Sequence, residues 1–164
     1  MNSRTTLILS AILLIFSFVA CSPSEEAPSE LPPGTSLISL REFGKPFSIP
    51  VPDTSQVKLT MMETSDGALT ITAGRNFALT ILEEPADLDL RKEDLNADEV
   101  NRLARIVRED STGLVWESAI TEPEFHFVLN RSVAGARYSF MDAPGFVFSE
   151  QDVQRMFECS SLAK

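Results

Sequence analysis

The side chain best suited to acid–base chemistry is the single histidine of the 164-residue chain, His126. It lies in the alternating segment Phe125–Asn130, which we predict to be a strand paired with the preceding segment Leu114–Ile120. A glutamate beside a histidine can orient the imidazole for base catalysis, or the two side chains can act as two metal ligands. Glu117 lies in the preceding strand, so Glu117 and His126 form a candidate polar pair.

The register of these two strands decides whether the pair can form. A four-residue loop, residues 121–124, pairs Ile120 with Phe125, Ser118 with Phe127 and Trp116 with Leu129. This register gathers the large side chains, except two valines, on one face, whereas a one-residue slip would place Glu117 there. His126 then lies opposite Ala119 and diagonal to Glu117. The more ordinary interpretation is a surface cross-strand pair worth about 0.2–1 kcal/mol, because no third metal ligand and no nucleophile motif lies near it in the sequence.

Acidic side chains gather between the two sets of predicted strands, at Glu83-Glu84, Asp87, Asp89 and Glu93-Asp94. Carboxylate oxygens are the ligands that calcium prefers, but the spacing D-x-[DN]-x-[DN]-G is absent from the sequence. We therefore interpret these clusters as a solvated rim. The sequence also lacks a serine nucleophile elbow, a P-loop, a GxGxxG motif and an HExxH motif. We predict no catalytic residue, no metal site and no cofactor.

The chain has two cysteines, Cys21 and Cys159, and neither belongs to a CxxC motif. Cys21 ends an apolar run, residues 7–20, that follows the positive charge of Arg4, which is the pattern of a secretory signal. If Cys21 is modified, Cys159 has no disulfide partner, and we expect it to be a structural cysteine on the last helix rather than a reactive thiol.

The residues Phe18-Val19-Ala20-Cys21 resemble the lipobox of bacterial lipoproteins, although that family prefers leucine where Phe18 stands. The resemblance implies that residues 1–20 are a signal peptide, that the Cys21 sulfur receives a diacylglycerol, and that its new amine is acylated with a palmitate-like chain. Ser22 implies sorting to the outer membrane. An ordinary cleaved signal and an uncleaved membrane anchor are the alternatives. We expect an envelope protein attached by its lipid, on a leaflet that the sequence does not specify.

Residues 22–34 are rich in proline, serine and glutamate, so residues 21–34 are predicted to be a lipidated cysteine and a disordered tether. Residues 35–164 form one predicted domain of normal single-core size. The full chain carries 14 basic and 24 acidic residues, a net charge of −10, and loss of Arg4 with the leader would make it −11. Such an acidic chain lacks the basic footprint that nucleic acid requires.

The hydrophobic pattern predicts an α+β fold. We expect strands at 57–61, 69–73 and 77–81 after an apolar start at 37–49, with an Asp66-Gly67 hairpin turn. A helix is expected over 87–110, with Val100, Leu103, Ala104 and Val107 as its apolar stripe. Strands at 114–120, 125–129 and 138–140 and a last helix over 149–164 follow. This order indicates an antiparallel sheet of about six or seven strands with two helices packed on one face.

The pattern weakly resembles the small PsbP/Mog1-like α+β domains. The phrases Leu-Val-Trp-Glu-Ser, Glu-Phe-His-Phe and Phe-Ser-Glu-Gln-Asp-Val, within residues 77–157, are also similar to uncharacterised envelope proteins of Bacteroidetes-type bacteria. Neither resemblance implies an activity. We therefore expect a non-enzymatic lipoprotein that serves as a tethered binding or accessory module for an envelope protein.

Two other functions stay open. A carrier of a small apolar ligand would have a pocket between the sheet and the helices, and a large internal cavity would favour it. An enzyme would use Glu117 and His126, and would lose a measurable activity in His126→Ala. A solid core with an exposed apolar patch would favour the binding module.

Overall fold

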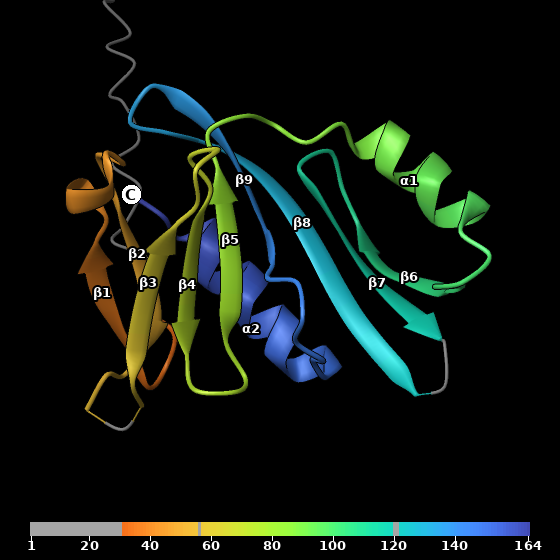
Figure 1. Cartoon of the computed structure of the whole chain (residues 1–164), viewed down its shortest axis with the longest axis horizontal. Helices are drawn as coiled ribbons and strands as arrows, with labels where there is room; N and C mark the ends of the chain where they lie inside the picture. The colour runs from red at the N-terminus through yellow and green to blue at the C-terminus, as the bar shows by residue number, and fades with distance from the viewer. Residues whose placement is uncertain (1–30, 56, 120–121) are drawn as a thin grey trace, which may run out of the picture.

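The computed structural model of the chain describes residues 31–55, 57–119 and 122–164 (Figure 1). The predicted signal peptide, the lipidation residue Cys21 and most of the predicted tether lie outside the described residues.

Seven antiparallel strands form the main sheet, in the order β3-β4-β5-β9-β8-β7-β6. Their bounds are β3 Leu59–Glu63, β4 Leu69–Ala73, β5 Ala78–Leu82, β6 Leu103–Glu109, β7 Gly113–Ala119, β8 Pro123–Val133 and β9 Ala136–Asp142. A separate two-stranded ribbon is made by β1 Thr35–Ser39 and β2 Ser48–Pro52, which flank the short 3-10 helix η1, Arg41–Phe43. The two helices are α1, Leu88–Ala97, and α2, Glu150–Ser161.

The α+β class, the antiparallel sheet and the presence of two helices are confirmed. The meander β3–β5 forms as its alternation predicts, with Met61 opposite Ile71 and Ile71 opposite Leu79. Gly67 makes the predicted hairpin turn at a φ of 80°, a left-handed conformation that glycine adopts without strain. Helix α2 begins with a capping box in which Ser149 and Asp152 satisfy each other's backbone N–H groups.

The predicted helix over 87–110 is wrong in its second half. Helix α1 ends at Ala97, and residues 103–109 form strand β6. The Asp98 carboxylate accepts hydrogen bonds from the backbone N–H groups of Val100 and Asn101, each at 2.8 Å, which turns the chain out of the helix. Val100 is 72% exposed, so it belongs to no apolar stripe.

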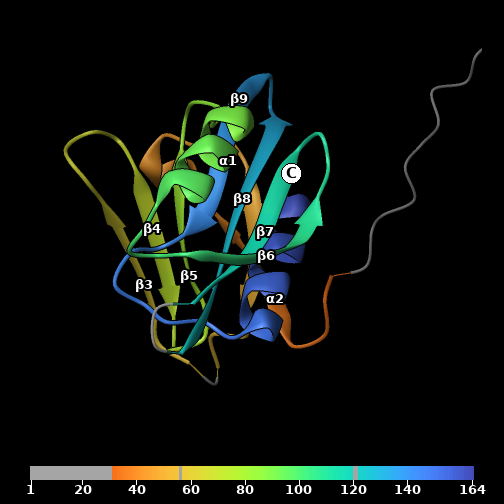
Figure 2. The same cartoon turned by 90° about the vertical axis from the view of Figure 1, so that its right-hand side faces the viewer.

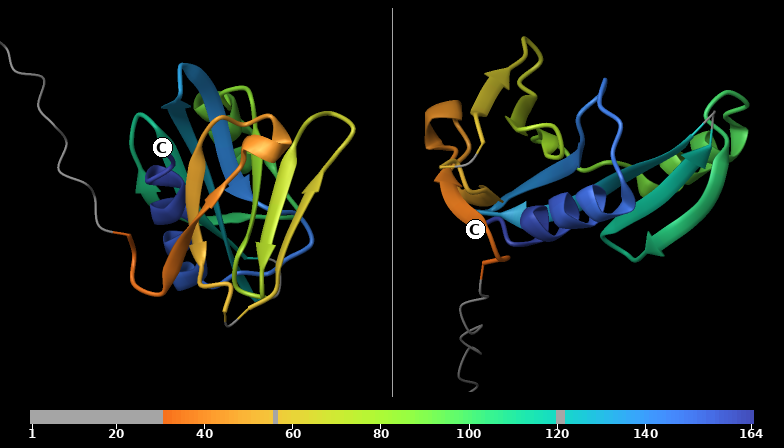
Figure 3. Two further views of the ribbon diagram at one scale, coloured as in Figure 1. Left: turned by 90° about the vertical axis from the view of Figure 1, so that its left-hand side faces the viewer. Right: turned by 90° about the horizontal axis from the view of Figure 1, so that it is seen from below.

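The two helices lie on opposite faces of the sheet, not on one face as expected (Figures 2 and 3). Adjacent residues of a strand point to opposite faces. Val115 on β7 packs in the main core with Phe157 of α2, whereas Leu114 and Trp116 pack in a smaller cluster with Leu88 of α1. Strand β7 is therefore buried on both faces.

This double burial explains why the predicted register of β7 and β8 is wrong. The structure pairs Ala119 with Pro123, Trp116 with His126 and Gly113 with Leu129. The prediction assumed one apolar face and one solvated face, and chose the register that gathered the large side chains. Because both faces of β7 carry apolar side chains, that criterion does not identify the register, and the true pairing differs by three residues.

Candidate functional site

His126 lies between two polar side chains on neighbouring strands. Its Nε2 atom is 3.1 Å from the Ser118 hydroxyl on β7, and its Nδ1 atom is 2.9 Å from Asp142 Oδ2 at the end of β9. The second carboxylate oxygen, Asp142 Oδ1, accepts the backbone N–H of Phe127 at 2.8 Å. We call Ser118, His126 and Asp142 the histidine network.

The network forms where β8 and β9 separate. Their last paired residues are Val128 and Met141. Beyond this point β9 no longer supplies a backbone carbonyl to β8, and the Asp142 carboxylate takes its place as the acceptor for Phe127. One side chain thus completes the sheet and fixes the ring nitrogen of His126.

The environment of the ring favours its charged form. The Trp116 ring stacks on the His126 ring at a centroid separation of 5.4 Å. Burial lowers the pKa of His126, but the hydrogen bond and charge of Asp142 and the charge of Glu124 outweigh burial and the charge of Arg91 on α1, so the pKa is raised above 6.5.

The predicted polar pair of Glu117 and His126 does not form. Glu117 lies opposite Phe125, and its carboxylate accepts a hydrogen bond from Arg105 Nε of β6 at 2.6 Å. Arg105 also bonds Glu150 of α2 at 2.8 Å, which places Glu117 on the α2 side of the sheet, whereas His126 faces the α1 side with Trp116. The polar partners of His126 are Ser118 and Asp142. Sequence reasoning missed Ser118 because the register of β7 and β8 was wrong, and it did not consider Asp142, which lies on β9.

The order serine–histidine–aspartate matches that of a hydrolytic triad, in which Nε2 faces the hydroxyl and Nδ1 faces the carboxylate. Ser118 is only 1% exposed, within β7 between β6 and β8. A nucleophile must reach the substrate, and backbone donors beside it must be free to hold the oxyanion. Here the hydroxyl is covered and the neighbouring backbone groups lie in paired strands. The geometry therefore gives the network a structural role and does not present Ser118 as a nucleophile.

The acidic clusters have structural roles in part. Asp87 is the N-cap of α1, where its carboxylate accepts the N–H groups of Asp89 and Leu90. Asp89 forms an ion pair with Lys92 at 2.8 Å. Within the described part of the chain, no three histidine, cysteine or acidic side chains are grouped so that they could hold a metal ion. Cys159 lies buried on α2, and burial raises the pKa of its thiol to about 11.

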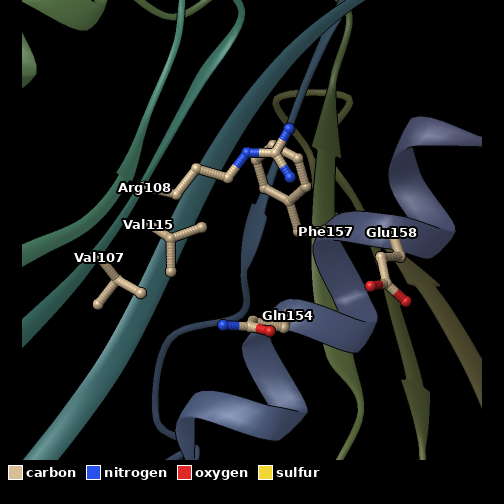
Figure 4. A pocket seen from close by; sticks show the side chains of 6 residues that line it. All are labelled: Val107, Arg108, Val115, Gln154, Phe157 and Glu158. Carbon is tan, nitrogen blue, oxygen red and sulfur yellow. The ribbon is translucent and has the colours of Figure 1, made fainter.

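A surface groove of about 310 Å³ lies between the β6–β7 hairpin and α2 (Figure 4). Its apolar residues are Val107 of β6, Val115 of β7 and Phe157 of α2, and its polar residues are Arg108, Gln154 and Glu158. The guanidinium of Arg108 lies over the Phe157 ring, 4.2 Å from the ring centroid. Its Nη2 atom donates a hydrogen bond to Asp110 Oδ2 at 3.0 Å. We call this the α2 groove.

An irregular strand builds one wall of the α2 groove. The pairing of β6 with β7 shifts between Leu103 and Arg105 and again between Ile106 and Arg108. A bulge lets two successive residues point toward the same face. Val107 and Arg108 therefore both line the groove.

No protein-family model, no curated protein and no solved structure matches this chain. The predicted resemblances to bacterial lipoproteins, to PsbP/Mog1-like domains and to Bacteroidetes-type envelope proteins therefore stay predictions. In the described part of the chain, no helix has both the length and the apolar character needed to cross a bilayer.

Proposed function

We propose that this chain is an outer-membrane lipoprotein whose folded part, residues 35–164, is a non-enzymatic binding module. The lipobox-like residues 18–21 support lipid attachment at Cys21, and the proline- and glutamate-rich tether supports a domain that stands away from the bilayer. Attachment to a membrane raises the local concentration of the module near envelope partners. The mass of the mature N-terminal peptide tests this part, because acylated Cys21 as its first residue is the expected result.

The α2 groove carries the binding role. Val107 and Phe157 give it apolar side chains, while the exposed Arg108 offers a cation at its edge. The core behind the groove is filled, with Phe127 fully buried and its ring centroid 6.1 Å from that of Phe157. Because the core behind it is filled, the groove would bind a side chain or ligand that approaches from solvent.

The partner that fits is an envelope protein that presents an apolar side chain next to an acidic one. The apolar side chain would displace water from the half-buried Val107. The acidic side chain would pair with Arg108 in competition with Asp110, which lies 3.0 Å from it. Nucleic acid is an unsuitable partner because the chain has a net charge of −10.

A photoreactive amino acid at Gln154, in the full chain in its own envelope, tests the proposal. We expect a cross-linked protein that is lost in Arg108→Glu, which reverses the charge at the groove. The matched control carries the probe at Val147, which is 66% exposed and does not line the groove. Equal cross-linking from both positions, or none from Gln154, would contradict a protein partner.

A carrier of a small apolar ligand is the second candidate, because the groove lies between sheet and helix and reaches the lower limit of ligand-pocket volumes, about 300 Å³. Native mass spectrometry of the full chain from its own envelope distinguishes the two. A bound small mass that is absent in Val107→Asp would support the carrier and replace the first proposal.

A further inference from the structure

The main sheet has two edge strands, β6 and β3, and they differ in how regularly they pair with their neighbouring strands. Edge strands expose unpaired backbone groups and are commonly protected by bulges and charges. Strand β6 has two irregularities in its pairing and carries Arg105 and Arg108. Strand β3 pairs regularly with β4 over its five residues and contains no proline. Figures 2 and 3 show the β3–β4 hairpin at the outer border of the molecule.

The hydrogen bonds of the hairpin reveal which groups of β3 face outward. Thr64 N–H donates to Ala68 carbonyl, and Gly74 N–H donates to Lys58 carbonyl. Bonded pairs alternate in an antiparallel ladder, so Thr60 and Met62 share the bonds with β4. The backbone groups of Leu59, Met61 and Glu63 therefore point away from the sheet. The side chains of Thr60 and Met62 are exposed, and Met62 is 60% exposed.

We propose that β3 pairs antiparallel with β3 of a second copy, around a two-fold axis at Met61. This register uses every outward backbone group, because Leu59 faces Glu63 of the other copy and Met61 faces its own equivalent. Thr60 then lies opposite Met62 of the other copy in a pair without backbone bonds, and the exposed Met62 is covered.

Charge supports a second copy as the occupant. Like net charges of −10 oppose association of two copies over most surfaces. At this edge the exposed Lys58 lies opposite Thr64 of the other copy and therefore diagonal to its exposed Asp66. Diagonal neighbours are about 7–8 Å apart, which long side chains can span. The two-fold axis produces this attraction twice.

Disulfide trapping in the envelope tests the register. Two tagged full chains are co-expressed, one with Thr60→Cys and one with Met62→Cys. Opposed residues without backbone bonds have Cα atoms about 4.5 Å apart, within the range of a disulfide. We expect the mixed pair to cross-link several-fold more than either variant alone and more than Thr60→Cys with Val147→Cys. No excess of the mixed pair, or a stronger product from one variant alone, would overturn the proposal.

A second measurement avoids introduced cysteines. The double variant Thr60→Lys/Met62→Lys places lysines directly opposite each other across the proposed interface, while both side chains stay exposed in one copy. Analytical ultracentrifugation of the detergent-solubilised full chain should show a dimer for the wild type and a monomer for this variant. Leu90→Lys, at a 54% exposed residue of α1, should stay dimeric. A monomeric wild type, or a dimeric double variant, would overturn the proposal.

Discussion

His126 Nδ1 and Asp142 Oδ2 are 2.9 Å apart, and this contact joins β8 to β9 at the point where their backbones separate. The contact survives both protonation states of the ring. Nδ1–H donates to Asp142 in each state, while the Ser118 hydroxyl can donate to neutral Nε2 or accept from Nε2–H. Both protonation states of the His126 ring therefore fit the same hydrogen-bond geometry.

The raised pKa of His126 predicts how stability depends on pH. Because its pKa is raised above 6.5 in the folded state, the folded chain binds the proton more tightly than the unfolded chain. The stabilisation is fully present below pH 6.5 and is lost as pH rises through the folded-state pKa. His126→Gln should therefore lose more stability in acid than in alkali. Urea unfolding of both proteins across this range measures the difference, and a difference independent of pH would contradict the prediction.

Substitution of Asp142 should separate its two roles, which are to accept the Phe127 N–H and to place a charge beside His126. Asp142→Ala leaves the Phe127 N–H without its acceptor, which costs about 1–3 kcal/mol for a buried donor. Asp142→Asn keeps an amide oxygen for that donor but removes the charge beside His126. We expect Asp142→Ala to lower the free energy of unfolding more than Asp142→Asn, and both to weaken the pH dependence. Equal losses in the two variants would show that the Phe127 bond contributes little.

Ser118 should not behave as a hydrolase nucleophile, despite its place in the network. Its 1% exposure denies a fluorophosphonate probe access to the hydroxyl. We expect the folded full chain to stay unlabelled, as Ser118→Ala does. Labelling of the wild type that Ser118→Ala and His126→Ala both abolish would contradict this and establish an enzyme.

Gly113 is predicted to be the glycine least tolerant of a side chain. A Cβ atom there would lie 2.6 Å from the Val128 carbonyl oxygen and 3.0 Å from the Phe157 ring. Gly113→Ala should lower the free energy of unfolding by about 1–3 kcal/mol, as forced overpacking does. The exposed neighbour Ser111→Ala is the matched control and should change stability by about 0.5 kcal/mol or less. Equal denaturation midpoints for both variants would contradict the prediction.

The elements predicted correctly from the sequence are those set by interactions between residues close together in the chain. The meander β3–β5 and helix α2 form as expected because alternation, the Asp66-Gly67 turn and the Ser149 cap each operate over a few residues. Residues 100–107 show the limit of periodicity. Their apolar spacing suits a helix as well as a strand, and the Asp98 side chain, which turns the chain after α1, decides between them.

The candidate site was predictable only in part. The sequence identified His126 as the side chain best suited to acid–base chemistry. Its partner Ser118 depends on the register of β7 and β8, which the apolar pattern does not determine because β7 is buried on both faces. The sequence pattern does not identify Asp142, because this residue acts where β8 and β9 separate. Hydrophobic periodicity does not indicate where two strands separate. The α2 groove depends on the irregular pairing of β6, which the pattern does not reveal either.

The path from β5 to β6 is attached to the sheet by the Asn130 amide, by Leu88 and Leu95 packed against Leu114 and Trp116, and by the ion pair of Lys92 with Glu109. The Asn130 side chain bonds both the N–H and the carbonyl of Ala86, each at 2.8 Å, and none of the ten residues of α1 that follow is buried among the described residues. In evolutionary terms, this makes the path the part of the domain most open to change. Substitutions and insertions in α1 would alter the surface above Trp116 while the main core, on the other face, keeps its packing. A new binding surface could therefore evolve on α1 with little loss in the free energy of unfolding.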